Sequence, residues 1–186
     1  MEQGRRPLKP DLAKVLDQVL DTKRALQTAV DNMPEIDLIP AWAEQYMDIE
    51  REAIALSWFE NQVLPGLLQT ERYAGAVFRT RIPAFSEEEI GAQVSARLER
   101  QEILRRKTPP NLSFILSEAI VRDRLGGDAV HRETLRNLRT CADLPGVTIQ
   151  IMPLGRETHA GLTGPFILLE TPDHQHLAYT ETQRGS

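Results

Sequence analysis

The sequence predicts an α+β (mixed α/β) protein, in which a small mixed β-sheet packs with helices and follows an N-terminal helical segment. Helical spacing of apolar residues dominates the chain up to about residue 107. Beyond it lie four short segments rich in branched and apolar residues, "NLSFIL", "VTIQIM", "PFILLE" and "HLAYTE". A helical pattern separates the first two, whereas the last two are consecutive. This order predicts a mixed sheet covered by helices.

The N-terminal segment begins with an amphipathic helix within residues 8–22. Its apolar residues recur with the spacing of one helical stripe: Leu12, Val15, Leu16, Val19 and Leu20. Pro10 suits the first helical position, and Asp11 suits the positive end of the helix dipole. Residues 21–37 carry a weaker pattern, and we interpret them as a linker that includes Pro34.

A second helix is predicted to begin near Pro40, followed by a short strand. The apolar face of the helix contains Trp42, Ala43, Tyr46, Ile49 and Ala53, and its charged face contains Glu44, Asp48, Glu50, Arg51 and Glu52. The next segment, "AIALSWFENQ", places Ile54, Leu56 and Trp58 on one side, an alternation that is typical of a strand. Phe59 departs from that alternation.

The segment "VLPGLLQTERYAGAVFRT" predicts a tight turn that leads into a helix. Pro65 and Gly66 interrupt the preceding element, since proline lacks an N–H and glycine permits positive φ, and Thr70 is a good N-cap. The helix then presents Tyr73, Ala74, Val77 and Phe78 on one face. A packed turn is the simpler interpretation. It gives the amide of Gln69 no function, so we expect this amide to face a pocket.

A capping box at residues 86–89 predicts a long helix that extends to about Lys107. Its apolar side contains Ile90, Val94, Leu98 and Leu104. Its arginines alternate with acidic residues and predict a solvated face with ion pairs, formed by Arg97, Arg100, Arg105 and Arg106 with Glu99 and Glu102. Another helix is predicted from Asp128 to about Ala142, with an inward side of Val130, Leu135, Leu138 and Cys141.

The length, cysteine content and charge of the chain limit the classes of protein to which it can belong. A chain of 186 residues is long enough for one ordinary domain with a small appendage. Its single cysteine cannot form an intramolecular disulfide, and no apolar run approaches the ~20 residues of a membrane span. We therefore expect a cytoplasmic protein without membrane contact. The formal net charge of −5 opposes broad attraction to nucleic acid.

No catalytic motif is apparent in the sequence. The pair of glycines at 126 and 127 lacks the frame of a phosphate-binding loop, and Cys141 falls on an apolar helix face that keeps its thiol protonated. His174 and His176 supply half a metal site at most. The sequence predicts no catalytic residue, no metal and no cofactor, and it favours a non-catalytic protein without excluding an enzyme.

Two regions of the second half supply candidate ligand-binding residues. Glu118 lies just beyond the strand "NLSFIL", where open sheets hold ligands, although Arg122 one helical turn later can form an ion pair with it. The loop 153–164 is long and contains glycines, as many binding loops do, and its His159 can act as an acid or base near neutral pH. A solvent-exposed excursion is the alternative interpretation of this loop.

The stretch "WAEQYMDIEREAIALSWFENQVLPGLLQTERYAGAVFRT" resembles the hallmark of a large actinobacterial family of toxin–antitoxin-like transcriptional regulators with a Cro/repressor-type helix-turn-helix domain. The resemblance continues through "ILSEAIVRDRLGG", "GVTIQIMPLG", "GPFILLE" and "AYTE". In that family the phrase "PGLLQT", followed by Tyr-Ala, marks a C-terminal effector domain of unknown function. Gln69 and Tyr73 of this phrase join Glu118, Arg122 and His159 as candidate ligand-binding residues.

The first residues, "MEQGRRPLKPDLAKVLDQVL", resemble the end of the helix-turn-helix domain, and Met1 stands where a tryptophan of that domain would be. The resemblance implies a remnant of this domain and a linker in residues 1–37, and an effector domain that binds a ligand or a partner in residues 38–186. The recognition helix reads the bases in such domains. We therefore expect DNA binding only where the missing N-terminal helices are present.

Two functions stay open at this point. The first is the sensing or interaction domain of an antitoxin-like regulator, whose partner is a small protein encoded nearby or a small-molecule ligand. The alternative is a stand-alone small-molecule-binding or biosynthetic protein of specialised metabolism derived from this domain. Direct DNA binding through the basic start of the chain ranks third, because few phosphate contacts give only weak, salt-sensitive affinity. A homodimer is allowed in each case.

Overall fold

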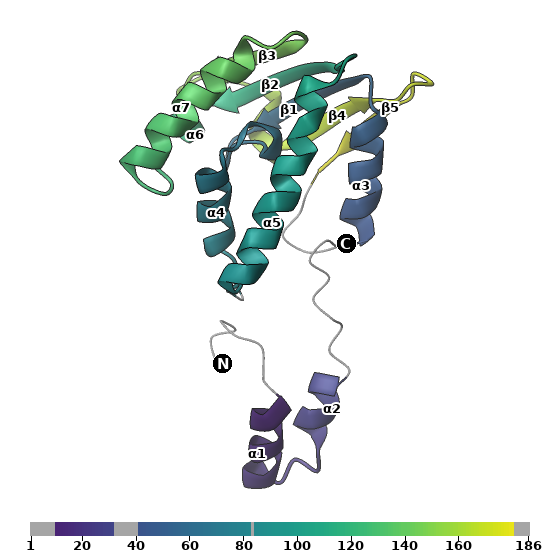
Figure 1. Ribbon diagram of the computed structural model, residues 1–186, viewed down its shortest axis with the longest axis vertical. Helices are drawn as coiled ribbons and strands as arrows, with labels where there is room; N and C mark the ends of the chain where they lie inside the picture. Colours follow the sequence, from purple (N-terminus) through teal and green to yellow (C-terminus); the bar gives the residue numbers. More distant parts are fainter. Residues whose placement is uncertain (1–9, 32–40, 83, 181–186) are drawn as a thin grey trace.

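The computed structural model describes residues 10–31, 41–82 and 84–180, and it confirms the α+β fold (Figure 1). The helices are α1 (Pro10–Leu20), α2 (Ala25–Asp31), α3 (Ala41–Glu52), α4 (Glu71–Arg79), α5 (Glu87–Arg100), α6 (Glu118–Arg122) and α7 (Asp128–Ala142). The strands are β1 (Ala55–Glu60), β2 (Asn111–Ser117), β3 (Val147–Met152), β4 (Phe166–Glu170) and β5 (His176–Tyr179). Short 3-10 turns are η1 (Gly66–Leu68), η2 (Gln101–Arg105) and η3 (Ala160–Thr163).

The five strands form one mixed sheet in the order β3-β2-β1-β4-β5. The central strand β1 pairs in parallel with β2, and β2 pairs in parallel with β3. On the other side β1 pairs antiparallel with β4, and β4 with β5. All five segments predicted as strands are therefore strands, and β1 lies at the centre of the sheet.

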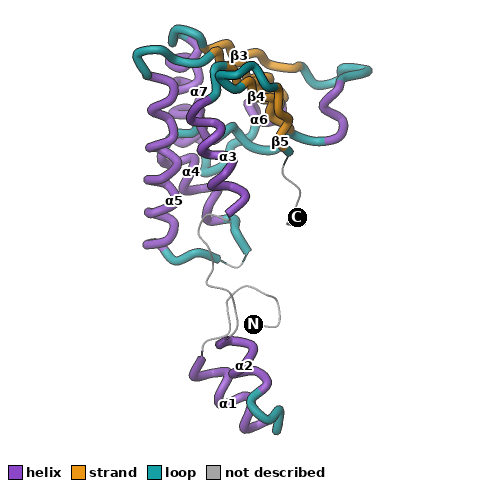
Figure 2. The backbone as a smooth tube through the Cα atoms, turned by 90° about the vertical axis from the view of Figure 1, so that its right-hand side faces the viewer, coloured by secondary structure: helices purple, strands orange, loops and turns teal. Residues whose placement is uncertain are grey.

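The helices of the region 41–180 cover one face of the sheet, as Figure 2 shows from the side. The residues that face them alternate along the strands and form the core, with Leu56 and Trp58 of β1 directly opposite Leu112 and Phe114 of β2. The rings of Trp58 and Phe114 stack with centroids 4.7 Å apart. The opposite face is largely open and exposes side chains from β1, β2, β3 and β4: Ser57, Ile115, Thr148, Gln150 and Leu168.

The N-terminal helix is confirmed, but part of the predicted linker is helical. Residues 25–31 form α2, because Asp17 of α1 accepts hydrogen bonds from the backbone N–H groups of Leu26 and Gln27, both at 2.9 Å. Asp17 also accepts a bond from the hydroxyl of Thr22. Burial raises the pKa of Asp17, but these hydrogen bonds outweigh it and lower the pKa to about 2. Pro34 lies outside the described residues.

Helices α4 and α5 begin where their caps predict. Thr70 accepts a hydrogen bond from the N–H of Tyr73, and Ser86 forms the predicted capping box with Glu89. The α-helix α5 ends at Arg100 rather than near Lys107, since the chain tightens into η2 over residues 101–105.

Several side chains, among them Glu50, Arg100 and Leu135, lie where the helical patterns did not place them. Glu50 and Arg100 were expected in solvent, but they form an ion pair in which Nη2 lies 2.9 and 2.8 Å from the two carboxylate oxygens, and Glu50 is only 3% exposed. Leu135 was expected to point inward, yet it is 38% exposed, because Thr134 takes the inward position on α7.

Candidate functional site

The loop that leads into α4 is pinned by side chains on both sides of its turn. Gln69 donates from Nε2 to the carbonyl of Leu64 at 2.6 Å, and the N–H of Leu64 donates to the hydroxyl of Tyr73 at 3.2 Å. Gln69 and Tyr73 thus both bond the backbone of Leu64. Both are buried, with 2% and 4% of their surface exposed. Burial raises the pKa of Tyr73, so its phenol stays protonated at neutral pH.

Side chains from two other helical elements complete the pinning of this loop. Gln101 donates from Nε2 to the carbonyls of Gly66 and Gln69, at 2.9 and 2.7 Å. Asn137 of α7 donates to the carbonyl of Leu68 at 2.8 Å. These bonds satisfy the carbonyls of Leu68 and Gln69, and they give the carbonyl of Gly66 a second donor beside the N–H of Gln69.

The remaining end of the Gln69 amide is also paired. Its Oε1 accepts a hydrogen bond from Nη1 of Arg97 at 2.9 Å, and the guanidinium of Arg97 lies over the ring of Phe78, 4.4 Å from its centroid. The side chain of Gln69 therefore connects the turn to α5. Both ends of the amide are bonded within the protein. A ligand-binding role for Gln69 stays a prediction.

A second buried polar cluster joins α3, α5 and β5. The hydroxyl of Tyr46 donates to Glu50 at 2.7 Å, and Arg100 holds the same carboxylate. The ring of Tyr46 stacks on that of Tyr179 with centroids 4.2 Å apart. Burial and the adjacent carboxylate raise the pKa of Tyr46 far above its usual range. The cluster ties elements distant in sequence together, and the phenol of Tyr46 stays protonated near neutral pH.

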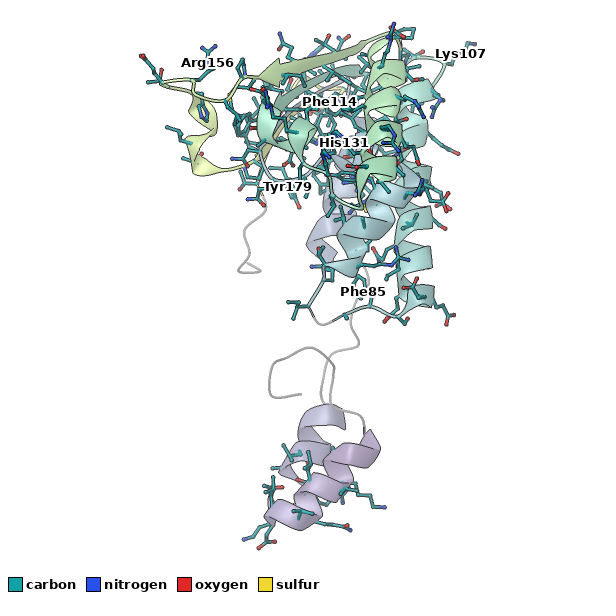
Figure 3. The ribbon with its side chains drawn as sticks, turned by 90° about the vertical axis from the view of Figure 1, so that its left-hand side faces the viewer. Phe85, Lys107, Phe114, His131, Arg156 and Tyr179 are labelled. Atoms are coloured by element: carbon teal, nitrogen blue, oxygen red, sulfur yellow. The ribbon has the colours of Figure 1, made fainter. Side chains whose placement is uncertain are left out.

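At the carboxyl end of the parallel strands, Glu118 and Arg122 form the ion pair that the spacing allows. Nε of Arg122 donates to Oε1 of Glu118 at 2.7 Å, and the N–H of Leu154 donates to Oε2 at 2.9 Å. The bond from Leu154, helped by Arg122, lowers the pKa of Glu118. Glu118 thereby anchors the start of the loop 153–164, which extends away from the sheet at Arg156 (Figure 3).

His159 lies farther along this loop, beside the face of the sheet that the helices leave open. Its ring is 6.0 Å from that of Phe59, which alternation places on the open face of β1. Gly161 packs on the same ring, since a Cβ there would lie 2.0 Å from Cε1 of Phe59. The loop therefore buries Phe59, which explains why this residue departs from the alternation predicted for β1. Nδ1 of His159 and Oδ1 of Asn61 are buried without a hydrogen-bond partner.

The five predicted site residues thus fall into three places. Gln69 and Tyr73 meet in the helical layer, Glu118 and Arg122 meet at the strand ends, and His159 lies beside Phe59. A hollow of about 380 Å³ lies elsewhere, on the open face near the amino ends of β1, β2 and β3. A row of hydroxyl side chains from paired positions lines it: Ser57, Ser113 and Thr148.

Arg97, Gln101 and Asn137 were not singled out from the sequence. Each is a polar residue on a helix that otherwise reads as amphipathic, and each bonds a residue at least 28 positions away. No signal within a single helix separates such residues from solvated ones. In the described ranges, no group of three or more His, Cys, Asp or Glu side chains is placed to hold a metal ion.

Comparison with known proteins shows the family of the chain. None of the helices in the described part is both long and apolar enough to cross a membrane. No curated protein and no solved structure matches the chain significantly. A family described as a domain of unknown function, DUF5753, matches residues 43–186, which include most of α3 and the whole sheet. Because this match covers most of the chain, the protein belongs to the DUF5753 family.

Proposed function

We propose that this chain is the effector part of an antitoxin-like transcriptional regulator and that it acts by docking a small partner protein. The observation that carries this proposal is the one-sided covering of the sheet: helices pack on one face, while the other face exposes Ile115 and Leu168, 38% and 48% of whose surface is accessible. Apolar side chains exposed on a flat sheet suit a protein surface better than a small ligand.

The candidate ligand residues also favour docking over ligand sensing. Gln69, Tyr73, Glu118 and Arg122 use their polar atoms in bonds within the protein. A ligand that engaged them would have to break bonds that hold the turn or the loop 153–164. Partner docking needs no such rearrangement, because interface backbones usually move little on binding.

The test is a binding measurement between the full chain and the small protein encoded beside it. We expect a stoichiometric complex at micromolar concentrations by calorimetry and by size-exclusion chromatography with light scattering. An unrelated small protein of similar size and charge serves as the control. Absence of a complex with the neighbouring protein would contradict the docking role, whereas a complex with both proteins would indicate nonspecific association.

A second function, small-molecule binding by a stand-alone or biosynthetic protein, is favoured by one observation. Oδ1 of Asn61 and Nδ1 of His159 are buried without partners, and buried polar groups normally find one in protein, water or ligand. Native mass spectrometry of protein purified from its own host tests this function. We expect a co-purified metabolite if it holds, and its loss in a His159→Phe variant. Bare protein would leave ordered water as the partner of both atoms.

A further inference from the structure

The edge of the sheet formed by β3 lacks the features that usually protect a strand edge. Among the described residues β3 pairs only with β2. Its six residues, "VTIQIM", include no charge, proline or glycine, whereas β5 at the other edge has four residues and begins with a histidine. Natural proteins blunt exposed edges with charge, proline, bulges or shortness, because an open edge accepts another strand.

The backbone groups on this open edge can be assigned. The N–H of Leu112 in β2 donates to the carbonyl of Gly146 at 2.7 Å, so the backbone of residue 146 points toward β2. Backbone direction alternates along a strand, which turns residues 148 and 150 toward β2 as well. Ile149 and Ile151 therefore direct their N–H and C=O groups outward, where an added strand would pair with them.

An apolar strip runs beside these groups on the side of the sheet covered by α7. Ile149 is half-buried and Ile151 is 43% exposed, and both lie on the helix side in register with Phe114 and Leu116. In Figure 1, α7 runs along β3 at the same edge of the domain. The strip would cover alternate side chains of a strand added to β3.

Leu135 extends this strip from α7. Two contacts identify the inner flank of α7, the one that faces α4. Glu133 accepts a hydrogen bond from Arg72 of α4 at 3.3 Å, and Asn137 donates one to the carbonyl of Leu68. Leu135 is two residues from each and so about 200° around the helix from both. It therefore lies on the outer flank, away from α4, and its 38% exposure is accounted for by the open edge.

Two arginines lie on the same outer flank. Arg132 and Arg139 are three residues before and four residues after Leu135, and both are exposed. Neither forms a salt bridge with a described residue, although the chain as a whole is acidic. They are separated by about 10 Å along the helix, close to the roughly 13 Å between residues four apart on a strand. Long side chains can close that difference.

We propose that the β3 edge and the outer flank of α7 bind an extended segment of the partner protein as an added strand. The segment carries an acidic, an apolar and a second acidic residue at alternate positions, so that the apolar side chain meets Leu135 and Ile151 and the acidic ones meet Arg132 and Arg139. Backbone bonds supply affinity in this mode of recognition, and alternate side chains supply specificity. The inference rests on the proposed function, because it names the partner's binding segment.

The probe is a synthetic seven-residue peptide with capped ends. It carries glutamate at its second and sixth positions, valine at its fourth and threonine elsewhere. We expect it to shift the amide resonances of Ile149 and Ile151 in the full chain and to slow their hydrogen exchange. A peptide with lysine in place of glutamate, and one with N-methyl groups on the edge-facing amides, should each bind at least tenfold more weakly.

Variants of α7 provide a matched comparison. Arg132→Glu combined with Arg139→Glu should weaken peptide binding at least tenfold, since it replaces attraction by repulsion at both acidic positions. Arg136→Glu serves as the control, because Arg136 is an exposed arginine of the same helix but lies about 100° around it from Leu135, on the side nearer α4. Circular dichroism spectra of all variants should match, because these side chains are exposed.

The outcomes separate this inference from the proposed function. If the neighbouring small protein binds but the β3 amides do not respond and the double arginine variant binds normally, the edge is not the site and the docking role stands. If the N-methylated peptide binds as well as the parent peptide, the attraction is charge alone and strand addition is wrong. If neither the neighbouring protein nor the peptide binds, both proposals are overturned.

Discussion

Two loops of this protein, residues 63–70 and residues 153–164, are both held against the sheet but by different means. The side chains of Gln69, Tyr73, Gln101 and Asn137 form hydrogen bonds with five backbone groups of the first loop. The second is held by one hydrogen bond, which the N–H of Leu154 donates to Glu118, and by the packing of a glycine. It also contains a buried ring nitrogen without a partner.

This difference separates a structural loop from one that is free to take part in binding. Each buried hydrogen bond that is broken leaves a polar group unpaired, so the first loop cannot open without a large cost. Regions with few such contacts open most easily and include many ligand-binding loops. The segment "PGLLQT" therefore helps to assemble the helical layer, and the less constrained loop 153–164 lies beside the open face of the sheet.

The largest effect is expected in the first loop, from Gln69→Ala. The substitution removes the hydrogen bonds of the Gln69 amide with the buried carbonyl of Leu64 and with Nη1 of Arg97. We expect a loss of about 2–3 kcal/mol in the free energy of unfolding, measured by urea denaturation. Gln150→Ala, on the exposed face of β3, is the matched control and should change stability little. Equal effects of the two substitutions would show that the loop is not pinned through this amide.

A smaller effect is expected in the second loop, from Gly161→Ala. The added methyl group would overlap the ring of Phe59, so the loop must move away from the open face. We expect a loss of about 1–3 kcal/mol, the usual range for overpacking, together with changed resonances of His159. Gly91→Ala is the control, because a Cβ at this site in α5 meets nothing within 4 Å, and alanine should stabilise the helix by about 0.5–1 kcal/mol.

The next effect in size is the pH dependence of the hydrogen bond by which Glu118 anchors the loop 153–164. The pKa of Glu118 is held below its ordinary value of 4.5, chiefly by the N–H of Leu154. Its contribution to stability is therefore present above pH 4.5 and is lost as the pH falls through the lowered pKa of the folded state. We expect the amide resonance of Leu154 to titrate in this range. A Glu118→Gln variant should remove the titration, and an unchanged profile would contradict the anchor.

The sequence predicted most elements and fewer of their contacts. The strands, the caps at Thr70 and Ser86 and the bounds of α7 follow from local patterns, because alternation and capping depend on residues a few positions apart. α2 was missed, since it is stabilised by Asp17, eight residues before its first residue. A cap supplied from another helix leaves no local signal.

The buried polar contacts could not be predicted for a related reason. Glu50 and Arg100 are fifty residues apart, and each reads as the polar side of its own helix. Their pairing depends on how α3 and α5 are brought together over the sheet, and a single sequence does not fix this. The same holds for the candidate site: Glu118 and Arg122 were paired correctly from their spacing of four, whereas the place of His159 beside Phe59 required the fold.

The smallest effect is expected from Arg122→Ala, and it sharpens the comparison of the two loops. The side chain of Arg122 is 72% exposed, and exposed ion pairs contribute little because water screens them and the side chains lose freedom. Glu118 keeps its bond to the N–H of Leu154 in this variant, so the anchor of the loop should survive. We expect no measurable change in the midpoint of urea unfolding and only a slight rise in the pH at which the Leu154 resonance titrates. A large loss of stability would mean that Arg122, and not the backbone bond, holds the second loop in place.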